Sequence, residues 1–451
     1  MHRARESEVN RGLNLQFPDF KSRSFALSER AKQSLPGGNT RTTVYMKPYP
    51  IYAARGLGCR VWDVDGTERI DCINNFTAAI HGYAHPSVIR AAQEQLKLGT
   101  SFGLPTQSEI ELAELLVDRV TSVDHCRFVN SGTEAVMSAL KAARAYTSRS
   151  KIAKCEGAYH GTYDYAEVSL DSPPDTWSGN EPKSIPYAKG TPTGVTNDVV
   201  VIPFNDIDTT VRILRAHARE LAGVLVDPMP NRAGLVPADR GYLQALREVT
   251  LEIGALLIFD EVISFRLGFN GCQRLWAIDA DLTVLGKIIG GGFPVGAVGG
   301  RRDIMAVFDP SNGKAALPQG GTFSANPMSM VCGVAAMTLL DPSAFQHLEN
   351  LGQRVRTGID EAFDRTGIPG QTTGLGSLIK IHFTDTPLHD YRSAIPSVQS
   401  ARMLDAFTTA LLNEGLLTAK NGLMALSTPM TVDDCDVIVA AIERALKRLT
   451  Q

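Results

Sequence analysis

Between Cys126 and about Val298 the sequence alternates short apolar runs with segments of helical periodicity, which begin at Thr133 and again near Tyr242. Strands that alternate with helices form βαβ units and a mostly parallel sheet that is covered on both faces. Because such crossovers are right-handed, the carboxyl ends of the strands meet along one edge, where ligands bind. The sequence therefore predicts an α/β fold. The apolar runs are CRFV, KIAKC, VVVIPF, GVLVDP and ALLIFDE.

The chain of 451 residues is too long for one hydrophobic core, so we expect a large and a small domain. After about Asp341 the pattern changes to that of an α+β C-terminal domain, whose last helix begins with a capping box, Thr431 to Asp434. Its predicted elements are a helix at 343–363, a strand at 377–383, a helix at 400–414 and a final helix. The predicted division is an N-terminal segment at 1–70 that belongs to the small domain or an interface, a large domain at 71–340, and a small domain at 341–451.

Near the N-terminus the segment GCRVWDVDGTERIDC alternates apolar and polar residues on either side of Asp65-Gly66. Alternation around an Asp-Gly pair is typical of two antiparallel strands joined by a tight turn. The sequence therefore predicts a β-hairpin here.

Composition excludes several classes of function. A formal net charge of −3 gives no electrostatic case for nucleic acid or anionic membrane partners. No apolar run approaches the roughly 20 residues of a membrane-spanning helix, and the basic N-terminus has no apolar segment behind it, so no secretory signal is predicted. The seven cysteines are an odd number without CxxC spacing. They indicate reduced thiols in a cytoplasmic protein, with no disulfide framework and no metal site.

An aspartate and a lysine form the first candidate site. The run ALLIF predicts a fully buried strand that ends at Asp260. Lys287 follows 27 residues later, in the apolar and glycine-rich setting TVLGKIIGGG. A lysine in such a dry setting is a candidate nucleophile, and a strand-end acid can keep a ring nitrogen protonated. The pair therefore predicts cofactor chemistry.

A turn between a strand and a helix forms the second candidate site. In FVNSGTEAVMSALKAARAYT an apolar strand is followed by Asn130, Ser131, Gly132 and Thr133, and then by a helix. Backbone N–H groups and two hydroxyls at the positive end of a helix dipole suit a phosphate. Taken alone, a serine or threonine at this place more often only caps the helix. The turn is not a Walker loop, because the glycine and lysine spacing of that motif is absent.

The segment EGAYHGTYDY places Tyr159 and His160 after the predicted strand KIAKC. An aromatic ring at a strand end can stack on a planar cofactor ring. Taken alone, such a tyrosine more often belongs to a core, and such a histidine is more often structural than a base. The phosphate turn, the aromatic ring, the strand-end aspartate and the buried lysine occur in one order along the chain. Their conjunction predicts a cofactor-dependent enzyme.

With these motifs the chain resembles the class III aminotransferases, which are pyridoxal 5'-phosphate enzymes of fold type I. The resemblance extends from about Leu35 to Leu446. It implies a fold type I architecture, pyridoxal 5'-phosphate as the cofactor, and a homodimer whose active sites lie at the subunit interface. The motifs that carry it are NSGTEA, AYHG, FDEV, LGKIIGGGFPVGAVGGRRDIM and GGTFSANPMSM.

The resemblance also implies roles for individual residues. Lys287 would bind the cofactor covalently and later move a proton at the substrate carbon, while Asp260 would pair with the pyridine nitrogen. Tyr159 and Val262 would pack on the two faces of the ring. The remaining residues implied to bind the cofactor are Ser131, Gly132 and Thr133 at the phosphate, Thr322 of the partner subunit at the same phosphate, and His160 of the AYHG motif.

Two subgroups of the family compete. LGKIIGGG and GGRRDIM resemble glutamate-1-semialdehyde aminomutase, but its DEVMTGFR is DEVISFRLG here, and Gly422 stands where its C-terminal glutamate would fall. PGGNTR, DEVISFRL and GLMALSTPM resemble the β-amino-acid (β-phenylalanine-type) aminotransferases. In that subgroup the arginine aligned with Arg41 holds the substrate carboxylate, a task that suits the paired donors of a guanidinium. The expected substrate-binding residues are Arg41, Phe76, Asn421 and Met424.

We therefore expect a transaminase that moves an amino group between a β-amino acid, or a related amine, and a 2-oxo acid by a ping-pong mechanism. Asn421 stands where the β-amino-acid subgroup has an arginine thought to take a carboxylate of the amino acceptor, with Lys420 beside it. This difference leaves the amino acceptor unassigned. The alternatives are an isomerase like glutamate-1-semialdehyde 2,1-aminomutase and an amine (omega) transaminase that requires no carboxylate.

Overall fold

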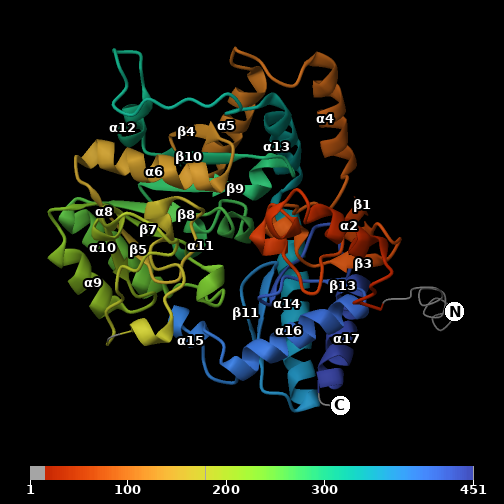
Figure 1. Cartoon of the computed structure of the whole chain (residues 1–451). Helices are drawn as coiled ribbons and strands as arrows, with labels where there is room; N and C mark the ends of the chain where they lie inside the picture. The colour runs from red at the N-terminus through yellow and green to blue at the C-terminus, as the bar shows by residue number, and fades with distance from the viewer. Residues whose placement is uncertain (1–15, 178, 450–451) are drawn as a thin grey trace.

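A seven-stranded sheet lies at the centre of the computed structural model, which describes residues 16–177 and 179–449 (Figure 1). The strand order is β4-β10-β9-β8-β7-β5-β6. Strands β5 to β9 pair in parallel, whereas β10 is antiparallel to both of its neighbours. The prediction of an α/β fold with a mostly parallel sheet is confirmed. The strands are β4 (His125–Val129), β5 (Lys151–Cys155), β6 (Val199–Ile202), β7 (Leu221–Val226), β8 (Leu256–Asp260), β9 (Leu282–Gly286) and β10 (Gly296–Gly300).

The antiparallel direction of β10 is not part of the sequence prediction. Only residues 287–295 separate β10 from β9, and a parallel crossover needs a dozen residues or more. The chain must therefore turn back directly after β9. As a consequence Lys287, the first residue of this connection, stays at the edge of the sheet where β9 ends.

Helices cover both faces of the central sheet. Leu225 of β7 packs in one cluster with α6 (Gly132–Thr147), whereas its neighbours Val224 and Val226 pack with α10 (Arg240–Ile253) on the other face. This two-sided burial explains why the strands appear in the sequence as continuous apolar runs. The other α-helices up to residue 339 are α2 (Arg23–Ala31), α3 (Asn74–Thr77), α4 (Pro86–Leu98), α5 (Gln107–Arg119), α7 (Asp164–Glu167), α8 (Thr193–Asn197), α9 (Ile207–Ala216), α11 (Gln273–Trp276), α12 (Arg302–Met305) and α13 (Pro327–Leu339).

The chain after Asp341 forms an α+β unit, as predicted. A three-stranded antiparallel sheet, β11-β12-β14, packs with its helices around one hydrophobic cluster. The capping box is present, because Thr431 Oγ1 accepts a hydrogen bond from the Asp434 N–H at 3.2 Å and the Asp434 carboxylate accepts one from the Thr431 N–H at 2.9 Å. The elements are α14 (Pro342–Thr366), β11 (Gln371–Thr373), β12 (Leu378–His382), α15 (Tyr391–Ala394), α16 (Val398–Asn413), β13 (Leu416–Leu417), β14 (Leu423–Ala425) and α17 (Val432–Leu449).

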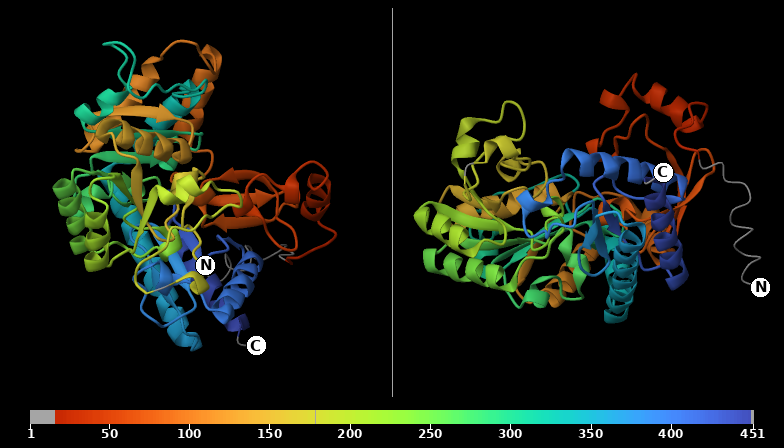
Figure 2. Two further views of the ribbon diagram at one scale, coloured as in Figure 1. Left: turned by 60° about the vertical axis from the view of Figure 1, so that its left-hand side comes forward. Right: turned by 90° about the horizontal axis from the view of Figure 1, so that it is seen from below.

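The hairpin predicted near the N-terminus is formed by β2 (Arg60–Asp63) and β3 (Glu68–Asp71), with Gly66 in the turn at a φ of +87°. A further strand, β1 (Ala53–Leu57), adds to its edge. On the other side β3 pairs in parallel with β13, so the N-terminal segment joins the C-terminal unit, and the two lie side by side in Figure 2. The domain boundaries at residues 70 and 340 stay a prediction.

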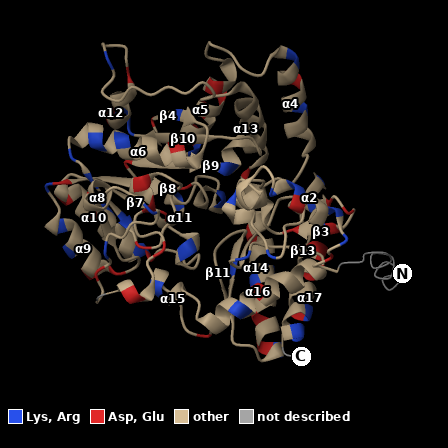
Figure 3. Ribbon diagram, viewed as in Figure 1, with Lys and Arg blue, Asp and Glu red and all other residues tan. Residues whose placement is uncertain are grey.

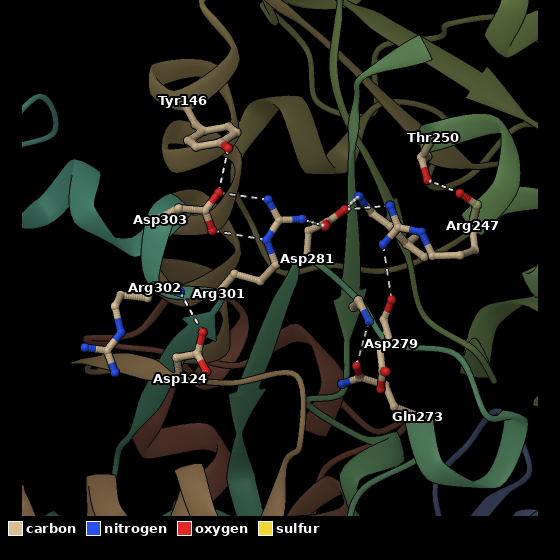
Figure 4. A network of polar contacts seen from close by, with 12 residues as sticks. Asp124, Tyr146, Arg247, Thr250, Gln273, Asp279, Asp281, Arg301, Arg302 and Asp303 are labelled. Carbon is tan, nitrogen blue, oxygen red and sulfur yellow. Dashed lines mark hydrogen bonds and ion pairs between the residues drawn. The ribbon is translucent and has the colours of Figure 1, made fainter. Parts of the chain in front are cut away.

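A buried aspartate fixes the sheet edge at which β9 begins (Figure 4). Asp281 is 3% exposed and accepts hydrogen bonds from Arg247 at 2.9 Å and from Arg301 at 2.6 Å. It also accepts the N–H of Leu257 at 2.8 Å. Two guanidinium groups and a backbone donor therefore compensate one buried charge, as such a charge requires. The contacts fasten the start of β9 to α10 and β8, and to the end of β10.

Lys and Arg residues are interspersed with Asp and Glu residues along the ribbon (Figure 3), in keeping with the small net charge of −3. Within the described residues no single helix is long and apolar enough to cross a membrane. The helices α13 and α14, which meet at a bend of 74°, are together long and apolar enough for such a span by length and composition alone.

Candidate active site

The carboxyl ends of β4, β5, β7, β8 and β9 meet at one edge of the sheet, as the sequence predicts. They surround a cavity of about 340 Å³, which we call the strand-end cavity. Eight of the nine residues expected to bind the cofactor line it. They are Ser131, Gly132, Thr133, Tyr159, His160, Asp260, Val262 and Lys287.

The turn before α6 combines a helix cap with an anion-binding geometry. Ser131 caps the helix, since its hydroxyl accepts the N–H of Glu134 at 3.2 Å. The first N–H groups of α6 lie at the positive end of the helix dipole and have no partners within the helix, which suits a phosphate. A Cβ atom at Gly132 would lie 3.1 Å from both methyl groups of Val262, so glycine lets the turn pack close to β8. The cap and the phosphate site are compatible roles of one turn.

The strand-end carboxylate of Asp260 is held by two donors. His160 Nδ1 lies 2.7 Å from Asp260 Oδ2, and the Val262 N–H donates to Oδ1 at 3.0 Å. Burial lowers the pKa of His160, although the hydrogen bond and the charge of Asp260 oppose that shift. A neutral His160 that donates its Nδ1–H therefore fixes the direction of the carboxylate. Both carboxylate oxygens retain lone pairs for a further donor.

Lys287 follows β9 with a φ of +51°, in the left-handed region that side chains other than glycine and asparagine rarely adopt. Strain of this kind is found at functional sites. Among the described residues its amine has no hydrogen-bond or ion-pair partner. Burial lowers the pKa of Lys287, and the charges of Asp260 and Asp227 oppose this effect. The result is an amine that releases its proton more readily than an exposed lysine, as a nucleophile must.

Asp227 is a second strand-end acid in the cavity, and it is not among the predicted site residues. It follows β7, whose Val226 pairs with Phe259 of β8, so it lies beside Asp260. Burial, together with the charge of Asp260, raises the pKa of Asp227 well above its usual range. Asp227 therefore keeps its proton to a higher pH than an exposed aspartate. The sequence signal is present, since the apolar run GVLVDP ends in an acid just as ALLIFDE does.

A second cavity of about 400 Å³ adjoins the first, and Asn75 lines both. We call it the arginine cavity, because Arg41 lines it together with Phe76, Tyr83 and Lys420. Arg41 Nη1 donates to the amide oxygen of Asn75 at 2.9 Å, and its guanidinium lies 5.2 Å from the ring centroid of Phe76. Within the described residues Arg41 has no carboxylate partner. Its charge is therefore available to an anionic ligand.

Asn75 and Phe76 belong to a left-handed turn that the sequence does not predict. The four residues Asn74, Asn75, Phe76 and Thr77 (α3, Asn74–Thr77) have φ angles of 51°, 48°, 52° and 75°. For residues other than glycine the left-handed helical conformation costs roughly 1–2 kcal/mol each, and it occurs as single residues, not as runs. Phenylalanine and the β-branched Thr77 are especially unsuited to it. We refer to these four residues as the left-handed turn.

Three of the predicted site residues lie outside both cavities. Thr322 is exposed on the segment before α13, away from the strand ends of its own chain. Asn421 is exposed, and its side-chain oxygen accepts the N–H of Leu423 at 3.3 Å. Met424 pairs with Ile379 across the C-terminal sheet and is fully buried in the core of that unit. Spacing in the sequence does not reveal the direction of the Met424 side chain, because that direction depends on which face of β14 packs inward.

The chain that forms this cavity, in which a lysine and two strand-end acids are lining residues, matches a known family. The model of the family "Aminotransferase class-III" covers residues 43–446. The chain belongs to the class III aminotransferases. A curated relative, glutamate-1-semialdehyde 2,1-aminomutase of Methanosphaera stadtmanae, is 39% identical to this aminotransferase over 430 residues, which are 95% of this chain and 99% of the relative.

Two solved structures resemble this aminotransferase over nearly its whole length. An omega-transaminase from Sphaerobacter thermophilus is 50% identical, with a TM-score of 0.95, and the match covers 98% of this chain and 100% of that one. A β-phenylalanine aminotransferase from Variovorax paradoxus is 35% identical, with a TM-score of 0.84 and 93% of each chain covered. The family and the fold predicted from the sequence are confirmed.

Class III aminotransferases depend on pyridoxal phosphate, and the chemistry of the strand-end cavity fits that cofactor. The free N–H groups and hydroxyls at the start of α6 suit a phosphate. The carboxylate of Asp260 suits a protonated ring nitrogen, and the amine of Lys287 suits an aldehyde carbon. Planar groups can pack between Tyr159, which is 46% exposed, and Val262. The individual assignments to the cofactor stay predictions.

Proposed function

We propose that this aminotransferase moves an amino group between a β-amino acid and a 2-oxo acid by a ping-pong mechanism, with Lys287 and Asp260 as the catalytic residues. The observation that carries the proposal is the guanidinium of Arg41 in a cavity next to the strand-end cavity, with no carboxylate partner among the described residues. A guanidinium presents paired donors that match a carboxylate. A donor whose amino group reaches Lys287 could thus place a carboxylate at Arg41.

The walls of the arginine cavity support a donor with an apolar side chain. Beside its charged residues the cavity is lined by apolar side chains, which favour apolar groups of a ligand. The name of the Variovorax paradoxus enzyme, a β-phenylalanine aminotransferase, agrees with this donor class. The apolar side chains are Val44, Met46, Pro50, Ile51, Ala53, Val61, Ile73, Phe76, Leu417 and Ala419.

In the proposed mechanism the tasks are divided among Asp260, His160 and Lys287. Pyridoxal phosphate, when bound, withdraws electrons from the substrate carbon that carries the amino group. Asp260, directed by His160, keeps a positive charge on the ring nitrogen. Lys287 removes the proton from the donor carbon that carries the amino group, and in the second half of the reaction it delivers a proton to the carbon of the 2-oxo acid that takes up the amino group. Its lowered pKa, caused by burial, leaves a larger share of the amine free to accept that proton near neutral pH.

The amino acceptor needs a second cation, and Lys420 is placed to provide it. Asn421 is exposed and lies outside both cavities, whereas Lys420 lines the arginine cavity. Its amine lies 5.8 Å from the ring centroid of Tyr45 and has no carboxylate partner within the described residues. We therefore assign a carboxylate of the 2-oxo acid to Lys420 instead of Asn421.

A second candidate is an aminomutase, which the name of the Methanosphaera stadtmanae relative favours. Gly422 argues against it, because this glycine stands where an aminomutase would have its C-terminal glutamate. Gly422 has a φ of +79°, and a Cβ atom there would lie 2.5 Å from the carbonyl oxygen of Ile381. The backbone therefore rejects a glutamate at this position. An isomerase also needs no separate 2-oxo acid, so a strict requirement for one separates the two functions.

The donor class is tested by Arg41→Ala with a matched pair of donors, 3-amino-3-phenylpropanoate and 1-phenylethylamine, which differ by a carboxylate. Removing a guanidinium–carboxylate contact costs roughly 1.5–3 kcal/mol, or about 10- to 150-fold in kcat/KM. We expect that loss for the amino acid and little change for the amine. Equal losses for both donors would make Arg41 structural. A wild-type enzyme that prefers the amine would instead favour an omega-transaminase without a carboxylate requirement.

We also propose a homodimer with shared active sites, in which Thr322 of each subunit serves the cavity of the other. Large apolar side chains are exposed beside Thr322, with Phe323 at 59%, Phe102 at 46% and Leu104 at 78%. The segment of Phe323 adjoins the segment of Phe102 and Leu104, since the side chain of Asn326 donates a hydrogen bond to the Thr100 carbonyl at 2.9 Å. Exposed apolar residues in such a group mark an interface.

We place the protein in the cytoplasm, as the sequence predicts. All seven cysteines are free thiols in the structure, and six of them are buried. Free thiols without disulfides are typical of a reducing compartment.

A further inference from the structure

The left-handed turn is braced from both ends by polar side chains. At its start Asp71 Oδ1 accepts the N–H groups of Ile73 at 2.6 Å and Asn74 at 3.0 Å. The amide of Asn74 donates to the carbonyl of Ala425 at 2.5 Å. The turn is thereby fastened to β14, far along the chain. A strained conformation persists only where its surroundings hold it in this way.

At its end the turn is held by Arg266, one of the largest buried side chains of the molecule, which is 1% exposed. Arg266 Nη1 donates to the carbonyl of Thr77 at 2.9 Å, Nε donates to the Ser377 hydroxyl at 3.0 Å, and Nη2 donates to the Leu426 carbonyl. All three acceptors are neutral, and within the described residues no carboxylate contacts this guanidinium. Burial lowers the pKa of Arg266 to about 9. A buried charge without a counter-ion is unfavourable. Holding Arg266 in this position therefore costs folding free energy.

The left-handed turn also leaves two of its own buried polar atoms without hydrogen bonds. Asn74 Oδ1 and Thr77 Oγ1 are buried and have no hydrogen-bond partner in the described part of the chain. Buried polar atoms without partners are rare in folded proteins and call for an explanation. Backbone strain, a buried cation and two unpaired oxygen atoms therefore coincide in one short segment. Such a concentration is expected where the geometry of a segment serves function.

The left-handed turn directs two of its side chains toward Arg41. The middle residues of the turn, Asn75 and Phe76, both contact that guanidinium, one through an amide oxygen at 2.9 Å and the other through its ring at 5.2 Å. In a right-handed turn these two side chains would leave in other directions. Asn75 also lines both cavities, so it lies on the boundary between the predicted cofactor site and Arg41.

We propose that Asn75 is a positioning residue that orients Arg41, and that the braced left-handed turn thereby sets the preference for donors that carry a carboxylate. This inference rests on the proposed function, in which Arg41 receives the donor carboxylate. Asn75 has an amide and carries no charge, so it accepts one N–H of the guanidinium while leaving the positive charge for the substrate. Aspartate at the same place would neutralise Arg41.

The test is Asn75→Gly in the holoenzyme, because glycine adopts positive φ without strain and keeps the turn while removing the amide. The matched control is Ser148→Gly. Ser148 has a φ of 57° and caps the end of α6 that is remote from the strand-end cavity. Both variants relieve a left-handed residue, and we expect neither to lower Tm. The readouts are KM and kcat for 3-amino-3-phenylpropanoate and 1-phenylethylamine, and the inhibition constant of 3-phenylpropanoate, a carboxylate that has no amino group to transfer.

For Asn75→Gly we expect the KM for 3-amino-3-phenylpropanoate and the inhibition constant of 3-phenylpropanoate to rise about tenfold, with kcat and the amine kinetics nearly unchanged. In Asn75→Asp both constants should rise further, and in Ser148→Gly neither should change. If Asn75→Gly keeps the wild-type ratio of kcat/KM for 3-amino-3-phenylpropanoate to kcat/KM for 1-phenylethylamine, while Arg41→Ala reduces that ratio, the inference is overturned and the proposed function stands. A reduced Tm with an unchanged ratio also overturns it. An unchanged ratio in Arg41→Ala overturns both.

Discussion

Replacement of Lys287 by alanine should lower multiple-turnover transamination by at least about 10⁴-fold, since in the proposed mechanism one amine supplies both the covalent attachment of the cofactor and the proton transfer at the substrate carbon. The structure gives the reason for this concentration of roles. Lys287 lies at the end of β9, its amine has no partner among the described residues, and burial lowers its pKa. Alanine removes the amine without filling the cavity. The loss should appear in kcat for every donor, in contrast to the donor-dependent loss in Arg41→Ala.

The measurement is steady-state turnover together with borohydride reduction and mass spectrometry. Reduction should fix the cofactor to Lys287 in the wild type and should label no lysine in Lys287→Ala. The control variant is Lys141→Ala, because Lys141 is exposed on α6, the same helix that begins at the phosphate turn. This control should retain full activity and labelling. Multiple turnovers in Lys287→Ala would show that another group performs the chemistry.

Asp260→Asn should lower kcat by roughly 10²–10⁴-fold, the range for loss of a group that controls a proton in the reaction. An amide cannot hold a positive charge on a ring nitrogen as a carboxylate does. The fold should survive the substitution, because the side-chain oxygen of asparagine can still accept from His160 or from the Val262 N–H.

Asp227→Asn is the matched control for Asp260→Asn, since both acids line the same cavity at the ends of adjacent strands. Burial and the charge of Asp260 raise the pKa of Asp227, so its carboxyl group keeps its proton to a higher pH than an exposed aspartate. The amide of asparagine has the same shape as a protonated carboxyl group. We expect kcat of Asp227→Asn to fall less than about tenfold. Similar losses in both variants, measured by single-turnover kinetics, would contradict the assignment of the ring nitrogen to Asp260.

Local patterns predict the central sheet and most of the strand-end cavity. The apolar runs that end at Val129, Cys155 and Asp260 are strands because they are buried on both faces, and their carboxyl ends converge whatever the details of the loops. Tyr159 and the turn before α6 follow such runs directly, whereas Lys287 follows β9, a strand that is not among the predicted runs. Their positions in the cavity are therefore consequences of chain order and parallel pairing.

Features that depend on contacts between distant segments are not predictable in this way. The reversal of β10 depends on a short connection, and the pairing of β3 with β13 joins residues that lie far apart in the chain. The left-handed turn contains no glycine to announce it, and it exists because Asp71 and Arg266 hold it. The side-chain direction of Met424 likewise follows from the packing of β14.

The central claim is that the enzyme transfers an amino group between two carbon skeletons, and an isotopically labelled donor tests it most directly. Purified holoenzyme would receive 3-amino-3-phenylpropanoate with a labelled amino nitrogen and an unlabelled 2-oxo acid, and the products would be analysed by mass spectrometry. The account predicts that the label appears in the amino acid formed from the 2-oxo acid, and that donor beyond one equivalent per active site is consumed only when that acid is present. A labelled nitrogen that stays on the donor skeleton, or turnover of an amino substrate without any 2-oxo acid, would contradict it.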